Sequence, residues 1–231
     1  MSDMRVDELV PRLEGSTLAL STIQLAGDAD SSISYAEHDA LLYVVDGTGS
    51  LVVAGSSSAL SSGTAGLVLA GEEAVLRADG GGLTVICATV GTEADRHAPI
   101  GARKTVTRID GAEAERATGA RSFQILFGPH NGSTRATLFA GFIPPSKAPW
   151  HYHLYDEIVW VPAGPGRLHI GETSEELGAG SAFRLRPRQV HIVENLSASG
   201  AMTVIGIFTP AGSPSAAYLM PDVAAEYRFA G

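Results

Sequence analysis

The chain has 231 residues, of which 45% are hydrophobic and 18% are charged, and it contains 27 glycines and 12 prolines. Low charge and many turn-forming residues favour an all-β protein, and this length allows one or two domains with a buried core. The formal net charge of −9 disfavours a nucleic-acid partner, because phosphate contacts require clustered Lys and Arg.

Cys87 is the one cysteine of the sequence, which excludes an internal disulfide and the Cys-rich zinc modules. The first residues, MSDMRVDELVPRLEG, lack the basic and apolar segments of a signal peptide. No apolar run is long enough to span a bilayer. We therefore expect a cytoplasmic protein with no membrane partner.

Apolar runs separated by glycine recur along both halves of the chain and are typical of short β-strands. Such spacing predicts a β-sandwich or a β-barrel. The runs cover residues 41–47, 50–55, 65–71 and 83–90 in the first half, and residues 135–142, 157–164, 181–187 and 202–208 in the second.

Residues 95–121 differ from both flanks. They hold six of the sixteen Lys and Arg residues of the chain and only short apolar runs. A basic patch could attract an acidic partner, but a solvated basic linker between two barrels fits the composition better. Within it, GAEAERATGA at 111–120 predicts a short helix that ends near Gly119.

The two halves resemble each other when the chain is shifted by 117 residues. LLYVVDGTGSL at 41–51 then falls on IVWVPAGPGRL at 158–168, and Gly63 falls on Gly180 without a net insertion. A repeat of this kind indicates two copies of one β-module.

The second copy contains a cluster of histidines in PWHYHLYDEIVWVPAG, residues 149–164. On a strand, His151 and His153 point to the same face. Glu157 has the same parity and can return towards them through a bend, and His191 follows a later strand that can cross over to join them. Three imidazoles and a carboxylate suit Fe, Mn, Ni, Zn or Cu rather than Mg or Ca.

These residues resemble the cupin superfamily, whose first motif is His-x-His, three or four residues, Glu, six residues and Gly. His151, His153, Glu157 and Gly164 have this spacing, and the second motif is matched by Gly180, His191 and Asn195. The resemblance implies an all-β fold of two cupin-type jelly-roll β-barrels, with one divalent transition metal held by His151, His153, Glu157 and His191.

The sequence departs from the family pattern at two places. The leading glycine of the first motif is Pro145, and the usual Pro-x-Gly of the second motif falls on Arg186 and Arg188. The second departure concerns the turn that presents His191.

At the offset of 117 residues, the four ligand positions of the first copy carry Ser34, Ala36, Ala40 and Ala74. We therefore expect a degenerate N-terminal barrel without a metal. The expected organisation is a barrel over 1–94, the basic linker 95–121, a metal-binding barrel over 122–212 and a C-terminal arm over 213–231, whose apolar residues predict a short helix docked on its own or a partner subunit.

Several side chains outside the ligand set have predicted places. Tyr43 and Trp160 are equivalent and point out of their barrels, which suggests burial between modules or subunits. The parity of 183–188 turns Arg184, Arg186 and Arg188 outward as an ion-paired stripe, whereas an inward arginine would imply an acidic substrate. Tyr155 and Phe183 are candidates for the substrate pocket.

A metal with four protein ligands keeps open positions for water, O₂ or a chelating substrate. The first functional hypothesis is a dioxygenase acting on a small organic molecule, in which Glu157 could also act as a base. Alternatives implied by the resemblance are an isomerase or cyclase, a decarboxylase and a hydrolase, and a non-catalytic small-molecule-binding protein stays open. We expect a homodimer.

Overall fold

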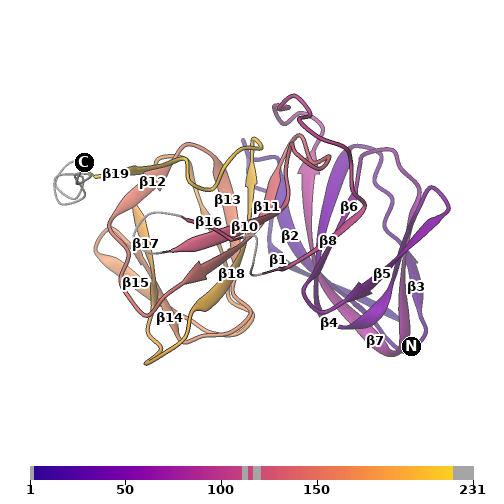
Figure 1. The fold of residues 1–231 in the computed structure, drawn as a ribbon, viewed down its shortest axis with the longest axis horizontal. Coiled ribbons are helices and arrows are strands. Elements are labelled where there is room, and N and C mark those ends of the chain that lie inside the picture. The colour runs from indigo at the N-terminus through magenta and orange to yellow at the C-terminus, as the bar shows by residue number, and fades with distance from the viewer. Residues whose placement is uncertain (1–2, 111–113, 117–120, 221–231) are drawn as a thin grey trace.

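The computed structural model describes residues 3–110, 114–116 and 121–220, and these residues form strands, turns and loops without a helix. Two groups of strands lie side by side (Figure 1). The prediction of an all-β fold is confirmed. In the described part of the chain, no helix is long and apolar enough to cross a membrane.

The first group forms one eight-stranded sheet with the order β1-β2-β7-β4-β6-β8, in which β3 also pairs with β7 and β5 with β4. Its strands are β1 (Met4–Val10), β2 (Leu18–Leu25), β3 (Asp30–Ser32), β4 (His38–Val53), β5 (Ser56–Ser61), β6 (Thr64–Val68), β7 (Ala74–Gly91) and β8 (Val106–Arg108).

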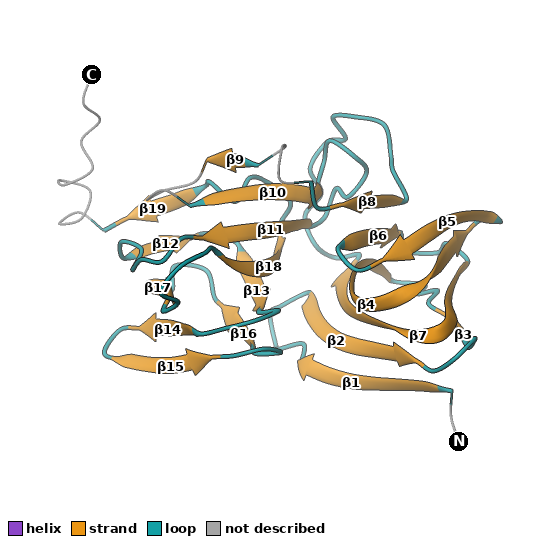
Figure 2. Ribbon diagram, turned by 60° about the horizontal axis from the view of Figure 1, so that its bottom comes forward, coloured by secondary structure: helices purple, strands orange, loops and turns teal. Residues whose placement is uncertain are grey.

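The long strands β4 and β7 pair along most of their length and curve around the barrel (Figure 2). Their register shifts near Asp46 and Gly49. A Cβ atom at Gly47 would collide with the carbonyl oxygen of Gly82, and one at Gly49 with that of Arg77. Glycine is therefore required where the two backbones approach each other at the bend.

The second group forms a six-stranded sheet, β16-β13-β18-β11-β10-β9, and a five-stranded sheet, β15-β14-β17-β12-β19. Its strands are β9 (Glu115–Arg116), β10 (Ser122–Phe127), β11 (Thr137–Ile143), β12 (His151–His153), β13 (Asp156–Trp160), β14 (Gly166–Ile170), β15 (Thr173–Leu177), β16 (Ala182–Leu185), β17 (His191–Asn195), β18 (Met202–Thr209) and β19 (Ala217–Leu219).

The expected linker contributes strands to both groups. β8 pairs with β6 of the first barrel, and β9 pairs with β10 of the second. Glu115 and Arg116 are thus strand residues, so the helix predicted at 111–120 is wrong at these two positions. Residues 111–113 and 117–120 lie outside the described residues.

The C-terminal arm also differs from the prediction. Its described part contains β19, which pairs with β12, instead of a helix. The unpaired edge of β12 offers backbone groups to an extended segment, and this pairing satisfies them. Residues 221–231 lie outside the described residues.

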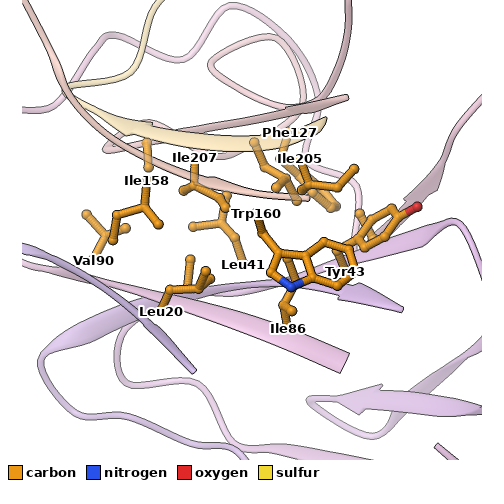
Figure 3. Packing of buried hydrophobic residues seen from close by; sticks show 14 of the residues in the cluster. Leu20, Leu41, Tyr43, Ile86, Val90, Phe127, Ile158, Trp160, Ile205 and Ile207 are labelled. Carbon is orange, nitrogen blue, oxygen red and sulfur yellow. The ribbon is translucent and has the colours of Figure 1, made fainter. Parts of the chain in front are cut away.

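The two barrels share one apolar core between them (Figure 3). Tyr43 and Trp160 are buried in it with ring centroids 6.3 Å apart, which confirms their predicted burial between modules. The strand pairing is also equivalent in the two barrels. Tyr43 lies opposite Ile86 in the first barrel, and Trp160 lies opposite Ile205 in the second. The interface is therefore nearly two-fold symmetric and is built from equivalent faces of the repeat.

Two largely buried ion pairs flank this apolar core. Asp39 of the first barrel pairs with Arg135 of the second, at 3.0 Å between Oδ2 and a terminal guanidinium nitrogen. Asp156, 117 residues after Asp39, pairs with Arg184. The Arg184 guanidinium also donates to the Leu18 carbonyl at 2.7 Å, so it points out of its barrel and joins the two modules.

Candidate metal centre

The expected ligands lie on three strands of the second barrel. His151 and His153 belong to β12, Glu157 to β13 and His191 to β17. His151 and His191 face each other across the β12–β17 pair, with ring centroids 4.4 Å apart. The ring centroids of His153 and His191 are 5.0 Å apart. All four side chains are buried, so the fold brings the predicted residues together.

Backbone carbonyls fix the orientation of all three imidazoles. Nδ1 of His151 lies 2.9 Å from the Pro149 carbonyl oxygen, and Nδ1 of His153 lies 2.9 Å from that of Tyr155. Nδ1 of His191 lies 2.8 Å from the Gln189 carbonyl oxygen. A carbonyl can only accept a hydrogen bond, so each Nδ1 carries a proton, and in the neutral form of each ring the lone pair lies on Nε2.

The carboxylate of Glu157 meets one of these nitrogens, since its Oε2 lies 2.8 Å from Nε2 of His153. The same Nε2 is buried and has no hydrogen-bond partner among the described residues. A lone pair facing a carboxylate oxygen is repelled unless a proton or a cation lies near both. The donor atoms therefore fit a divalent transition metal.

The chemistry of the four side chains suits a metal, but their atoms are not arranged as a complete coordination shell. Within the described residues, no three His, Cys, Asp or Glu side chains form a group already spaced to hold a metal ion. The imidazoles are nevertheless prepared for binding. Burial, followed by neighbouring positive charge, lowers the pKa of His151 to about 4, and burial lowers that of His191 to about 3, so both rings are neutral at pH 7.

A cavity of about 100 Å³ lies beside these donors. The predicted pocket residue Tyr155 lines it and is stacked on the His153 ring at 4.1 Å and on Phe208 at 4.0 Å between centroids. The structure places the other candidate, Phe183, outside this cavity, beside Leu168 and Arg184. The remaining lining is largely apolar and comes mainly from Phe123, Phe139, Phe142, Ile143, Val159, Leu185, Val193 and Val204.

Arg121 also lines the cavity, although the sequence places it in the basic linker. Its charge acts on the site, because after burial it helps to lower the pKa of His151 and His191. Arg121 directly precedes β10 and shares parity with Phe123, which points into the cavity. The shared parity of Arg121 and Phe123 could have identified Arg121 as a cavity residue. This would have required a prior prediction that Phe123 points inward.

The N-terminal barrel is shifted by one residue relative to the offset of 117 in the segment between β3 and β4. The Arg188 N–H donates to the His153 carbonyl at 2.7 Å, and the Gly71 N–H donates to the Tyr35 carbonyl at 2.8 Å in the equivalent place. Tyr35 therefore occupies the place of His153, and the assignment of Ala36 to it is wrong.

The same shift puts Ile33 at the place of His151. Its N–H donates to the Ala74 carbonyl at 3.1 Å, and Ala74 is the register equivalent of His191. Ser34, which was expected there, bonds with its hydroxyl to the backbone of Ala74 instead. The cause is one additional residue between Tyr35 and Ala40. Ala40 itself occupies the place of Glu157, as the offset of 117 predicts, because Ala40 pairs with Val68 as Glu157 pairs with Leu185.

The turn before His191 contains a strained residue where the cupin motif has glycine. Arg188 has a φ of 64°, in the left-handed region, and its equivalent Gly71 has a φ of 80°. A side chain with a Cβ costs about 1–2 kcal/mol in this region. Arg188 therefore replaces the glycine of the motif while the backbone keeps the left-handed conformation that Gly71 has at the equivalent turn.

An Arg188→Gly variant is expected to be more stable than the natural chain by about 0.5–1 kcal/mol, since the relief of strain exceeds the added chain entropy. Chemical denaturation of the metal-free protein measures this. Arg186→Gly is the matched control and should destabilise, because Arg186 does not have a positive φ. Equal effects of the two substitutions would contradict the strain at Arg188.

Comparison with known proteins supports this description. Residues 140–208 match the family described as the cupin domain. No curated protein matches the chain.

Solved structures of the same fold cover nearly the whole chain. A variant of the oxalate decarboxylase of Bacillus subtilis has a TM-score of 0.74 at 12% identity, over 99% of this chain and 78% of that one. AerE from Microcystis aeruginosa has a TM-score of 0.72 at 12% identity, over 90% and 93%. The protein Ylba from E. coli has a TM-score of 0.70 at 12% identity, over 90% and 83%. Identities this low show a shared fold alone.

Proposed function

The chain belongs to the cupin superfamily, and from that premise we propose that its second barrel is a metalloenzyme site acting on a small organic molecule. His151, His153, Glu157 and His191 would hold one divalent transition metal there. The first barrel would serve as a structural partner, since Ile33, Tyr35, Ala40 and Ala74 stand at its ligand positions.

The observation that carries this proposal is the orphaned Nε2 of His153 opposite Glu157. A protein that used these residues only for packing would be expected to satisfy a buried imidazole nitrogen with a donor, because an unmade hydrogen bond costs about 1–3 kcal/mol. Three rings that are held through Nδ1 by backbone carbonyls, so that Nε2 is the nitrogen available to a metal, fit the requirements of a metal ligand set.

When bound, a divalent metal with open coordination positions can polarise a substrate or activate O₂. The protein contributes orientation and exclusion of water. Stacking of Tyr155 on His153 fixes one ligand ring, and the aromatic wall limits access of solvent to the cavity. The Oε2 atom of Glu157 lies 2.8 Å from Nε2 of His153, and the carboxylate would serve as a base if it leaves the metal.

Among the reactions that suit such a site, our first candidate is oxidation of a small molecule by O₂, as in a dioxygenase. Redox-neutral chemistry, such as isomerisation, cyclisation, decarboxylation or hydrolysis, uses the same donors and is the alternative. The similar structures include an oxalate decarboxylase, so the same fold supports a redox-neutral reaction in at least one protein. A non-catalytic binding protein would hold ligand without turnover.

Elemental analysis of the purified chain tests the proposal, with one transition-metal ion per chain expected. An O₂-consumption screen with small organic substrates then separates dioxygenase from redox-neutral chemistry. A metal content near zero after growth and dialysis with each of Fe, Mn, Ni, Zn and Cu would refute the site, as would two metals per chain.

A further inference from the structure

The edge of β1 offers a place for a further strand. Among the described strands, β1 pairs with β2 alone, and Figure 2 shows it at the margin of the first group of strands. The strand contains no proline, and its register with β2 is regular from residue 4 to residue 8. An open row of backbone groups on a regular strand can pair with a strand of another chain.

The pairing of β1 with β2 determines which backbone groups face this edge. The Asp3 carbonyl accepts a hydrogen bond from the Ala26 N–H at 2.9 Å, in line with the register of the two strands. In an antiparallel pair, residues two apart direct their backbone groups to the same neighbour, so Arg5 and Asp7 also face β2. The N–H and the carbonyl of Val6, which lies between them, therefore point to the open edge.

The side chain of Val6 adds an apolar surface to this edge. Val6 lies opposite Ile23, which is buried in the core of the first barrel, and side chains of opposite residues share one face of a sheet. Val6 is nevertheless 51% exposed. Further along β1, Val10 is buried in the core between the barrels, which holds the strand in its extended form and lowers the cost of ordering it on binding.

The charges of β1 fit a second copy of the same strand. When two copies run antiparallel about a two-fold axis at Val6, Arg5 of each copy lies opposite Asp7 of the other, and the N–H of each Val6 meets the carbonyl of the other. An axis at Arg5, Asp7 or Glu8 would place like charges opposite each other. The charge pattern therefore selects one register.

The ion pair already present in one chain is compatible with this arrangement. Nε of Arg5 lies 2.8 Å from Oδ2 of Asp7, and both side chains are exposed at 72% and 41%. Two copies would join their pairs into one cluster of alternating charge. The edge strand β15 lacks such a pattern, because an antiparallel copy centred on its Glu175 or Glu176 would place carboxylates opposite each other.

We propose that β1 is the contact surface for a second copy of this chain, in which the two first sheets join into one continuous sheet across a two-fold axis at Val6. The surface belongs to the first barrel and uses none of the metal donors, so the proposal goes beyond the proposed function and does not depend on it. The same strand serves both copies, and each open edge pairs once, so the assembly closes as a dimer.

Sedimentation velocity of the full chain over a wide range of protein concentrations tests this, with a monomer–dimer equilibrium expected. Val6→Pro removes the N–H that faces the open edge and leaves the hydrogen bonds to β2, so it should give a monomer. Arg5→Asp and Asp7→Arg each place like charges opposite each other at both contacts. Each should weaken dimerisation about 10- to 100-fold.

Two combinations of these substitutions should restore the dimer. The double variant Arg5→Asp/Asp7→Arg reverses the charges and keeps them complementary. An equimolar mixture of the two single variants should form a mixed dimer, because one chain then carries two negative charges at these positions and the other carries two positive charges. A single variant that failed to fold would not be repaired by mixing, so this result identifies the contact itself.

The matched control is Glu175→Arg, which changes the net charge as Asp7→Arg does but lies on the exposed edge strand β15. It should leave dimerisation unchanged, which separates a local contact from an effect of total charge. Thermal unfolding of Val6→Pro, followed by circular dichroism, checks that the first barrel stays folded.

Three outcomes would overturn the proposal. These are a natural chain that stays monomeric at every concentration, a dimer that persists unchanged in Val6→Pro, and charge variants whose double variant and mixture both remain monomeric. The metal content of each variant is measured alongside and should equal that of the natural chain. Failure of the dimer would therefore leave the proposed metal site standing, and absence of the metal would leave the dimer standing.

Discussion

Removal of the metal with a chelator is expected to lower the free energy of unfolding by about 4 kcal/mol, if free metal had been present at roughly a thousand times its dissociation constant. The four donors come from β12, β13 and β17, so a bound ion would link strands of both sheets of the second barrel. Unfolding scatters these donors, and the binding energy therefore appears as stability. Thermal unfolding followed by circular dichroism, with and without chelator, measures the shift.

Ligand variants distinguish this site from unspecific metal binding. His153→Ala should abolish both the bound metal and the stabilisation by added metal. His169→Gln is the matched control, because it removes a histidine of the same barrel that bonds to Glu194 at 2.7 Å and does not line the cavity. A chelator effect of equal size in His153→Ala and His169→Gln would place the metal elsewhere.

Metal retention should also have a characteristic dependence on pH. An ordinary imidazole is protonated below about pH 6.5 and then loses its lone pair for the metal. Burial lowers the pKa of His151 to about 4 and that of His191 to about 3, which moves competition by protons to lower pH. The metal should stay bound as the pH falls through 6.5 and be released as it approaches about 4.

Much of the site was predictable because its donors are close in sequence and obey strand parity. His151 and His153 lie on one strand, and the spacing to Glu157 and His191 follows the cupin motifs. The repeat also located the equivalent faces that bury Tyr43 and Trp160. These predictions depend on local periodicity, which the fold preserves.

The predictions failed where contacts between residues distant in sequence determine the structure. Nothing local shows that β19 pairs with β12, because an edge strand can accept many extended segments. The one-residue shift at Ile33 and Tyr35 arises because the loop before Ala40 is one residue longer than its counterpart in the second barrel. A constant offset of 117 residues does not allow for this difference. Arg121 was missed because the composition assigns it to the basic linker 95–121, whereas in space it lines the cavity together with apolar side chains such as Phe123 and Phe139.

The largest effect on stability alone is expected at the interface between the barrels. Trp160→Ala should lower the free energy of unfolding by about 3–5 kcal/mol, the usual cost of truncating a buried large aromatic side chain. Trp160 is 6% exposed and packs against Tyr43 of the other barrel, so the loss affects the contact between the modules. Urea denaturation of the metal-free chain measures the change.

A double-mutant cycle with Tyr43→Ala isolates the contact between the two rings. Because the rings are tilted with centroids 6.3 Å apart, we expect a coupling of about 0.5–1.5 kcal/mol in addition to the separate costs. Trp150→Ala is the control, since the other tryptophan is only half-buried and contacts His169 outside the interface. A cost for Trp160→Ala no larger than for Trp150→Ala would mean that the two barrels are stable without their shared core, and the first barrel could then not act as the structural partner of the second.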